Sequence, residues 1–250
     1  MMLALVLLVA AATAAPAPAA PASAYIAVEL ERDVFTRTNA ERARYHLPPL
    51  RYDEGLQQAA REHCDDMLRR GFFSHVNPEG ESPSDRVAQW DRRLIGEAGE
   101  NIWMGSGYTG ALYAHLPSEI VGGFMKSPGH RANILREDFT HLGVGVTFYN
   151  GTVHAAQVFA AAAGFTATPV PDIIRSGQII SFQVRPEKGE PLPVQFDLSL
   201  RGGERRIVGP WTSLESARIE APPGLYRLRF YFPDGGRKMW IHGGPQIAVR

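Results

Sequence analysis

Two apolar runs of this 250-residue chain are separated only by the dipeptide Asn150-Gly151. The runs are LGVGVTFY at residues 142–149 and TVHAAQVFA at residues 152–160. Asn-Gly is strongly preferred in two-residue turns between antiparallel strands, because both turn residues must adopt positive φ. The sequence therefore predicts a β-hairpin here, and other elements of the fold must cover it.

Helical spacing of apolar residues precedes the hairpin. It predicts helices over residues 26–44 and 54–70, the second ended by Gly71 as C-cap. Another helix is expected over residues 118–126. Ser127-Pro128-Gly129 is expected to end that helix and to turn the chain.

Ser82, Pro83 and Asp85 mark one more helix start. Ser82 is the expected N-cap, Pro83 suits the first helical position, and Asp85 completes a capping box. Helices that come before an antiparallel hairpin indicate an α+β domain in which the helices cover a small sheet.

The pattern changes beyond a proline-containing boundary near residue 165. PVQFDLSL (193–200) and GLYRLRFYF (224–232) alternate between apolar and other residues, as strands with one buried face do. Asp234-Gly235-Gly236 predicts a turn into a last strand near residues 238–241. The inner faces are expected to carry Val194, Phe196, Leu198 and Leu200 in the first strand, and Tyr226, Leu228, Phe230 and Phe232 in the second.

The expected organisation is an α+β domain over residues 25–165 followed by a small all-β sandwich over residues 170–250. Residues 1–24 carry a short apolar core and then small residues in A-x-A spacing, which predicts a cleaved signal peptide and a secreted or extracytoplasmic protein. An uncleaved anchor is the alternative. No transmembrane segment is expected in the mature chain, because no later run is long and apolar enough.

Composition excludes some classes of protein. Lys and Arg total 26, as do Asp and Glu, which argues against a nucleic-acid partner. The single cysteine, Cys64, cannot form an internal disulfide and lies among apolar residues at helical spacing, so we expect a packed thiol.

Residues with reactive or metal-binding side chains gather in FFSH (72–75), AGENIW (98–103) and SPGHRANIL (127–135). Together with Asn39-x-x-Arg42, PLRYD, GVGV and AQVF, these motifs resemble the CAP superfamily of cysteine-rich secretory, antigen 5 and pathogenesis-related proteins. The motifs occur in family order over about residues 30–162, and the disulfide-free bacterial secreted members are the most similar. The last 80 or so residues lie outside this resemblance.

The resemblance implies an α-β-α sandwich with a central cleft lined by two histidines and two glutamates. By motif, His75 and His130 match the histidines and Glu100 matches one glutamate. Ser127 stands where the second glutamate is expected, and Glu119 lies upstream on the same predicted helix as an alternative. A three-residue site of His75, His130 and Glu100 therefore remains.

Two neutral imidazoles are good ligands for Zn²⁺ or a similar divalent cation, and a carboxylate can ligate or take a proton from bound water. With two protein nitrogens, a loosely held metal is expected rather than a structural one. Structural alternatives also exist. His75 could cap its turn, His130 could bond the backbone near Pro128, and Glu100 could bond backbone N–H groups. Asn101 and Asn133 are expected to tie loops down.

Three functions are open. The first is a secreted non-catalytic binding module whose cleft holds a cation and a small or lipidic ligand, since members of the family are implicated in lipid binding, signalling and defence. The second is a metal-dependent hydrolase in which Glu100 activates water. The third is a structural module of the cell envelope, with an envelope component as partner. No organic cofactor is expected.

Overall fold

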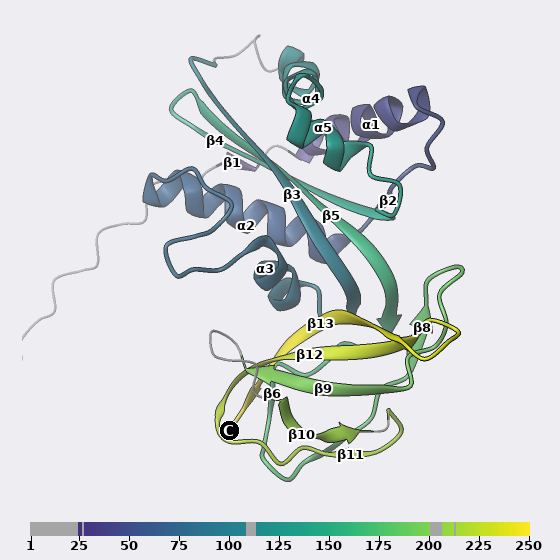
Figure 1. Ribbon diagram of the computed structural model, residues 1–250. Helices are drawn as coiled ribbons and strands as arrows, with labels where there is room; N and C mark the ends of the chain where they lie inside the picture. Colours follow the sequence, from purple (N-terminus) through teal and green to yellow (C-terminus); the bar gives the residue numbers. More distant parts are fainter. Residues whose placement is uncertain (1–24, 27, 109–113, 201–206, 213) are drawn as a thin grey trace, which may run out of the picture.

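The computed structural model describes residues 25–250 apart from 27, 109–113, 201–206 and 213, so the expected signal peptide lies outside the described residues (Figure 1). The helices are α1 (Val28–Arg44), α2 (Glu54–Arg70), α3 (Pro83–Trp90), α4 (Leu116–Lys126) and α5 (Pro128–Ile134). The strands of the first half are β1 (Tyr25–Ile26), β2 (Arg51–Tyr52), β3 (Leu94–Ser106), β4 (His141–Tyr149) and β5 (Thr152–Thr166). Those of the second half are β6 (Ile173–Ile174), β7 (Ile179–Ile180), β8 (Val184–Pro186), β9 (Gln195–Leu200), β10 (Ile207–Thr212), β11 (Ala217–Arg218), β12 (Gly224–Pro233) and β13 (Met239–Val249).

The first half is a sheet between two layers of helices, which confirms the predicted α+β class (Figure 1). Its strands follow the order β1-β4-β5-β3. On one face, α2 and α3 pack through Leu56 and Val87 against Ala156 and Val158 of β5. On the other face, α1, α4 and α5 form a second core with alternate residues of β4 and β5. Within the described residues, no helix is both long and apolar enough to cross a membrane.

The β4–β5 hairpin confirms the prediction from Asn150-Gly151. Both turn residues have positive φ, 48° and 75°, as this turn requires. The strands pair antiparallel over their whole contact, from the Tyr149–Thr152 pair to the His141–Ala160 pair. β5 continues to Thr166, beyond the expected end, because its second half pairs with β3 and β8.

The valines and glycines of the GVGV motif in β4 face opposite sides of the sheet. Val144 and Val146 belong to the core beneath α1 and α4. A Cβ at Gly143 would lie 2.0 Å from the backbone nitrogen of Gln57, and one at Gly145 would lie 2.4 Å from that of Arg61. The two glycines therefore let the backbone of α2 rest directly on the sheet.

The helix expected over residues 26–44 begins only at Val28, because Tyr25–Ile26 form β1 beside β4. Two other segments differ more from the sequence-based expectations. Residues 94–106 form the long strand β3, which the sequence did not predict because its glycines concealed the strand pattern. One of them, Gly99, leaves room for Phe139, whose Cζ would lie 2.6 Å from a Cβ there. Residues 128–134 form the helix α5 instead of a turn, because Ser127 takes the N-cap position and Pro128 the first turn, where proline is favoured.

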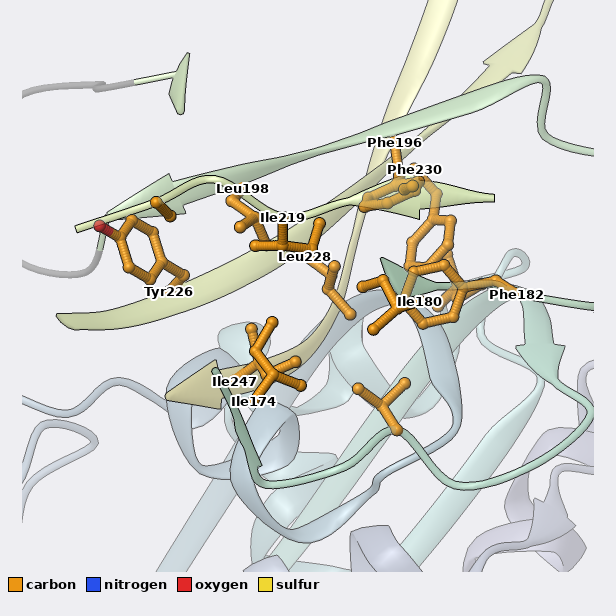
Figure 2. Packing of buried hydrophobic residues seen from close by; sticks show 14 of the residues in the cluster. Ile174, Ile180, Phe182, Phe196, Leu198, Ile219, Tyr226, Leu228, Phe230 and Ile247 are labelled. Atoms are coloured by element: carbon orange, nitrogen blue, oxygen red, sulfur yellow. The ribbon is translucent and has the colours of Figure 1, made fainter. Parts of the chain in front are cut away.

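The second half is built on the antiparallel strands β9, β12 and β13 (Figure 2). Their inner faces bury Phe196, Leu198, Tyr226, Leu228, Phe230 and Phe232, as the alternation predicts. A much smaller layer, the β7–β11 pair with Ile180 and Ala217, covers this face.

The sheets of the two halves are continuous. β13 joins β3 through the pair Gly243–Gly96, and β8 pairs with the end of β5, so one sheet of eleven strands runs through both halves. Ile95 of β3 and Ala163 of β5 also lie in the core of the second half. Strands of the first half therefore contribute residues to the core of the second half.

Candidate functional site

Glu100 is the centre of the candidate site. It lies on β3 opposite Val158, a residue of the core beneath α2, so its side chain faces that layer. The side chain is only 1% exposed. Oε1 accepts a hydrogen bond from Nδ1 of His75 at 2.8 Å, and Oε2 accepts one from Nη2 of Arg86 at 2.7 Å. Both carboxylate oxygens are therefore engaged by cationic or polarisable partners.

Arg86 connects the pieces that surround Glu100. It is buried on α3, where it donates to the backbone carbonyl of Glu81 at 2.9 Å and to that of His75 at 3.1 Å. The capping box of Ser82 and Asp85, which confirms the prediction, fixes the start of this helix. The loop that carries His75 is thus held by hydrogen bonds to the backbone carbonyl and to the ring of His75.

His75 presents its other ring nitrogen outward. Its side chain is 48% exposed. Because the Glu100 carboxylate accepts, Nδ1 carries a proton, and in the neutral form of the ring Nε2 keeps its lone pair. Nε2 has no hydrogen-bond partner among the described residues. A carboxylate behind a histidine in this way sets the tautomer and orients the ring, as it does behind metal-bound histidines.

His130 lies on α5, in the opposite helix layer. Its ring packs edge-on against Phe124 with centroids 5.1 Å apart, and its carbonyl accepts a hydrogen bond from Asn101 Nδ2 at 3.0 Å. Burial, and secondly the charge of His75, lower the pKa of His130. Both histidines therefore contact neighbouring residues of β3, although they belong to different layers.

A buried polar network fixes α5 against β3. Asn133 Nδ2 donates to the carbonyl of Glu100 at 3.1 Å and to Asn101 Oδ1 at 2.9 Å. Asn101 Nδ2 also donates to Gln157 Oε1 at 3.0 Å, and Gln157 Nε2 donates to Thr38 Oγ1 at 2.6 Å. The structural role predicted for both asparagines is confirmed. The contributions of Gln157 and Thr38 had no sequence signal of their own.

Neither position considered for a second acid joins the site. Ser127 is the N-cap of α5, and its side chain makes no capping hydrogen bond. Glu119 is exposed and accepts a hydrogen bond from the hydroxyl of Tyr108 at 2.6 Å. Burial, and then Glu119, raise the pKa of Tyr108 to about 12.

Two histidines that the sequence placed in packing or surface roles, His63 and His154, are buried, and His63 lies behind Glu100. Nε2 of His63 donates to the carbonyl of Ser74 at 2.9 Å and lies 3.8 Å from Glu100 Oε1. Burial lowers the pKa of His63 and of His154, which favours neutral rings. Within the described chain, Nδ1 of each ring is buried without a hydrogen-bond partner. Helical spacing signalled the burial of His63, but nothing signalled its approach to Glu100.

The donor set limits what the site can hold. In the described part of the chain, no three or more His, Cys, Asp or Glu side chains are grouped as metal ligands. Glu100 is committed to His75 and Arg86, which leaves the imidazoles of His75 and His130 as the available donors. Such a set fits a weakly held cation with open coordination positions and does not fit a closed structural site. Cys64 adds no reactive thiol, because it is buried and burial raises its pKa well above the usual value.

Comparison with known proteins agrees with this architecture. The sequence model of the cysteine-rich secretory protein family, CAP, matches residues 35–160, half of the chain. The chain belongs to the CAP family. It is 40% identical over 115 residues to YkwD, an uncharacterized protein of Bacillus subtilis (strain 168), covering 46% of this chain and 41% of YkwD. With YlbC, an uncharacterized membrane protein of the same organism, it shares 35% identity over 116 residues, 46% of this chain and 31% of YlbC.

This CAP chain therefore spans less than half the length of either relative. Among solved structures, an extracellular protein with an SCP domain from Bacillus anthracis str. Ames is 32% identical, with a TM-score of 0.43. That match covers 53% of this chain and 40% of the other protein.

Proposed function

We propose that this chain is an extracytoplasmic CAP binding protein that holds a divalent cation through His75 and His130 and, at the open coordination positions, a small or lipidic ligand. The observation that carries the proposal is the 2.8 Å contact between Nδ1 of His75 and buried Glu100, which leaves an exposed Nε2 with a free lone pair. The lowered pKa of His130 adds support, because a neutral ring is the form that ligates.

Glu100 acts in this proposal as a positioning residue. A general base must reach bound water, whereas the Glu100 side chain is only 1% exposed and both its oxygens accept hydrogen bonds from protein groups. The hydrogen bond to His75 orients the ring so that its other nitrogen can ligate the cation. The arrangement thus favours binding over the hydrolase alternative.

Zn²⁺ titration by calorimetry, with competition by a chromophoric chelator, tests the proposal. His75→Ala and His130→Ala should each weaken Zn²⁺ binding by at least about tenfold, since each removes one of two protein donors. His115→Ala is the matched control, because His115 is exposed at the start of α4 and lies outside the site. Equal Zn²⁺ affinity in the wild type and in both site variants would refute the cation site.

Glu100→Gln separates positioning from direct ligation. Gln keeps the shape of Glu and still accepts a hydrogen bond, so the stoichiometry of Zn²⁺ binding should not change. It lacks the negative charge that holds the His75 ring, so Zn²⁺ affinity should fall about ten- to a hundredfold. Turnover of an ester or peptide library by the Zn²⁺-loaded wild type, absent in Glu100→Gln, would instead establish the hydrolase.

The extracytoplasmic location rests on the leader-like residues 1–24. Expression with and without residues 1–24 followed by fractionation tests it, with the N-terminal sequence of the exported protein as readout. Retention of both forms in the cytoplasm would contradict this part of the proposal.

A further inference from the structure

The end of the second half that carries the β12–β13 turn exposes a run of apolar side chains. Met239, Trp240 and Ile241 are consecutive in β13 and are 40%, 63% and 49% exposed. Successive residues of a strand point to opposite faces, so this run makes both faces of the hairpin end apolar. We call residues 233–241 the hairpin tip.

The connection between β8 and β9 extends this apolar surface. The backbone N–H of Val194 donates to the carbonyl of Tyr231 at 2.9 Å, which places Val194 beside Phe232 at the base of the tip. Phe232 in turn pairs with Trp240. Leu192 and Val194 are 58% and 50% exposed. The alternation predicted Val194 on the buried face, but β9 begins only at Gln195, and Val194 lies exposed just before it. Figure 1 shows the turn and the connection projecting from the same end of the second half.

The hairpin tip also carries free positive charge. Arg237 and Lys238 are exposed, and their side chains form no ion pair or hydrogen bond with any described residue. The acid of the tip, Asp234, is engaged in the turn. Its Oδ1 accepts from the backbone N–H of Gly236 at 2.8 Å and of Lys238 at 3.2 Å. In the connection of residues 187–194, exposed Lys188 and Glu190 offset each other and Glu187 forms an ion pair with Arg51, so the tip keeps its net positive charge.

An exposed apolar cluster of this kind marks an interaction surface. Tryptophan favours the boundary between headgroups and acyl chains, aliphatic neighbours enter the acyl region, and adjacent cations bind lipid phosphates. A sugar would instead require several hydrogen-bonding side chains beside the tryptophan. We propose that the hairpin tip inserts into the surface of an anionic lipid bilayer and holds the protein there.

Vesicle co-sedimentation tests the insertion. The full chain is used for every variant, so that residues 1–24 contribute equally, with vesicles of phosphatidylcholine containing 30% phosphatidylglycerol as the probe. Trp240→Ala should lower the partition coefficient by about tenfold, because it removes the side chain best suited to the interface. Ile179→Ala is the matched control: Ile179 is 56% exposed in the same half, on β7, and its loss should leave partitioning unchanged. Both substitutions are at exposed positions, so thermal unfolding should match the wild type.

The charge component is tested separately. Arg237→Gln and Lys238→Gln should each lower partitioning onto the anionic vesicles by about fivefold, since each surface cation contributes about that much. Partitioning onto pure phosphatidylcholine should not change. Arg175→Gln, at an exposed position away from the tip, is the control and should behave as the wild type.

The depth to which the hairpin tip inserts is measured by the quenching of tryptophan fluorescence by lipids brominated on the acyl chain. The wild type should be quenched, whereas Trp240→Phe should still bind but lose the bromolipid quenching. Equal partitioning of wild type and Trp240→Ala, or quenching that survives in Trp240→Phe, would overturn the proposal. So would a stable dimer by light scattering that Trp240→Ala converts to a monomer, because the tip would then bind a second copy of the chain. None of these outcomes involves the cation site.

Discussion

The two halves of the chain reach stability by different means. Among the described residues, all the buried polar or charged side chains except Asp197 lie before residue 167. The second half packs apolar residues almost alone, from Phe182 and Phe196 to Ile247 and Val249. A buried hydrogen bond constrains both the orientation and the distance of the two groups that it joins, whereas apolar contacts constrain only the volume that the side chains fill. The CAP half therefore holds a defined set of side chains around Glu100, and the second half provides a platform.

Arg42 gives the strongest test of this difference. Its guanidinium is fully buried and donates to the carbonyls of Pro48, Ile134 and Arg136 at 2.8–2.9 Å. Arg42→Met should lower the free energy of unfolding by about 4 kcal/mol, because it leaves these buried carbonyls without donors. Urea denaturation measures the loss. Arg44→Met, at an exposed position on the same helix, should change it by less than about 0.5 kcal/mol, and similar losses in the two variants would contradict the argument.

Asp91 provides a pH-dependent test. Burial, and then the charge of Asp53, raise the pKa of Asp91 to about 7. The folded state therefore binds a proton that the unfolded state releases near pH 4, so stability should fall as pH rises from 4 to 7 and level off above. Asp91→Asn should remove a fall on the order of 3 kcal/mol. Urea midpoints of both proteins between pH 4 and 8 measure this difference, and parallel profiles would show that Asp91 does not contribute.

The smallest effect is expected in the second half. Phe230 lies fully buried between Phe182 and Phe196. Phe230→Leu should cost only about 1 kcal/mol, because an apolar core adjusts to a similar volume. In the CAP half Thr38→Val, also similar in volume, should cost more, about 2 kcal/mol, because Gln157 Nε2 would lose its acceptor. Thermal unfolding of both variants checks the order, and the reverse order would remove the distinction between the halves.

The features that the sequence predicted are those encoded by neighbouring residues. The Asn150-Gly151 turn, the capping box at Ser82 and the left-handed C-cap at Gly71 each depend on a few adjacent side chains. The buried alternation of β12 was also correct, because one face of that strand is uniformly apolar.

Features that depend on distant partners were missed. β3 is rich in glycine because Phe139 and other distant groups approach it, so its strand pattern is weak. The contact of Glu100 with Arg86 joins a strand to a preceding helix, and no local spacing encodes it. Family motifs selected His75, His130 and Glu100 as candidates, but the hydrogen bonds to both Glu100 oxygens could be seen only in the fold.

The sheets of the two halves join where Gly96 of β3 pairs with Gly243 of β13. A Cβ at Gly96 would lie 2.3 Å from the carbonyl oxygen of Ala161, so this position has no room for a side chain, and at Gly243 the Arg227 side chain fills the corresponding space. Because the sheet is continuous from one half to the other here, the two halves cannot rotate independently as domains joined by a flexible linker do. The sheet therefore sets the distance between Glu100 and the second half, and the candidate site keeps that distance from any surface that the second half binds.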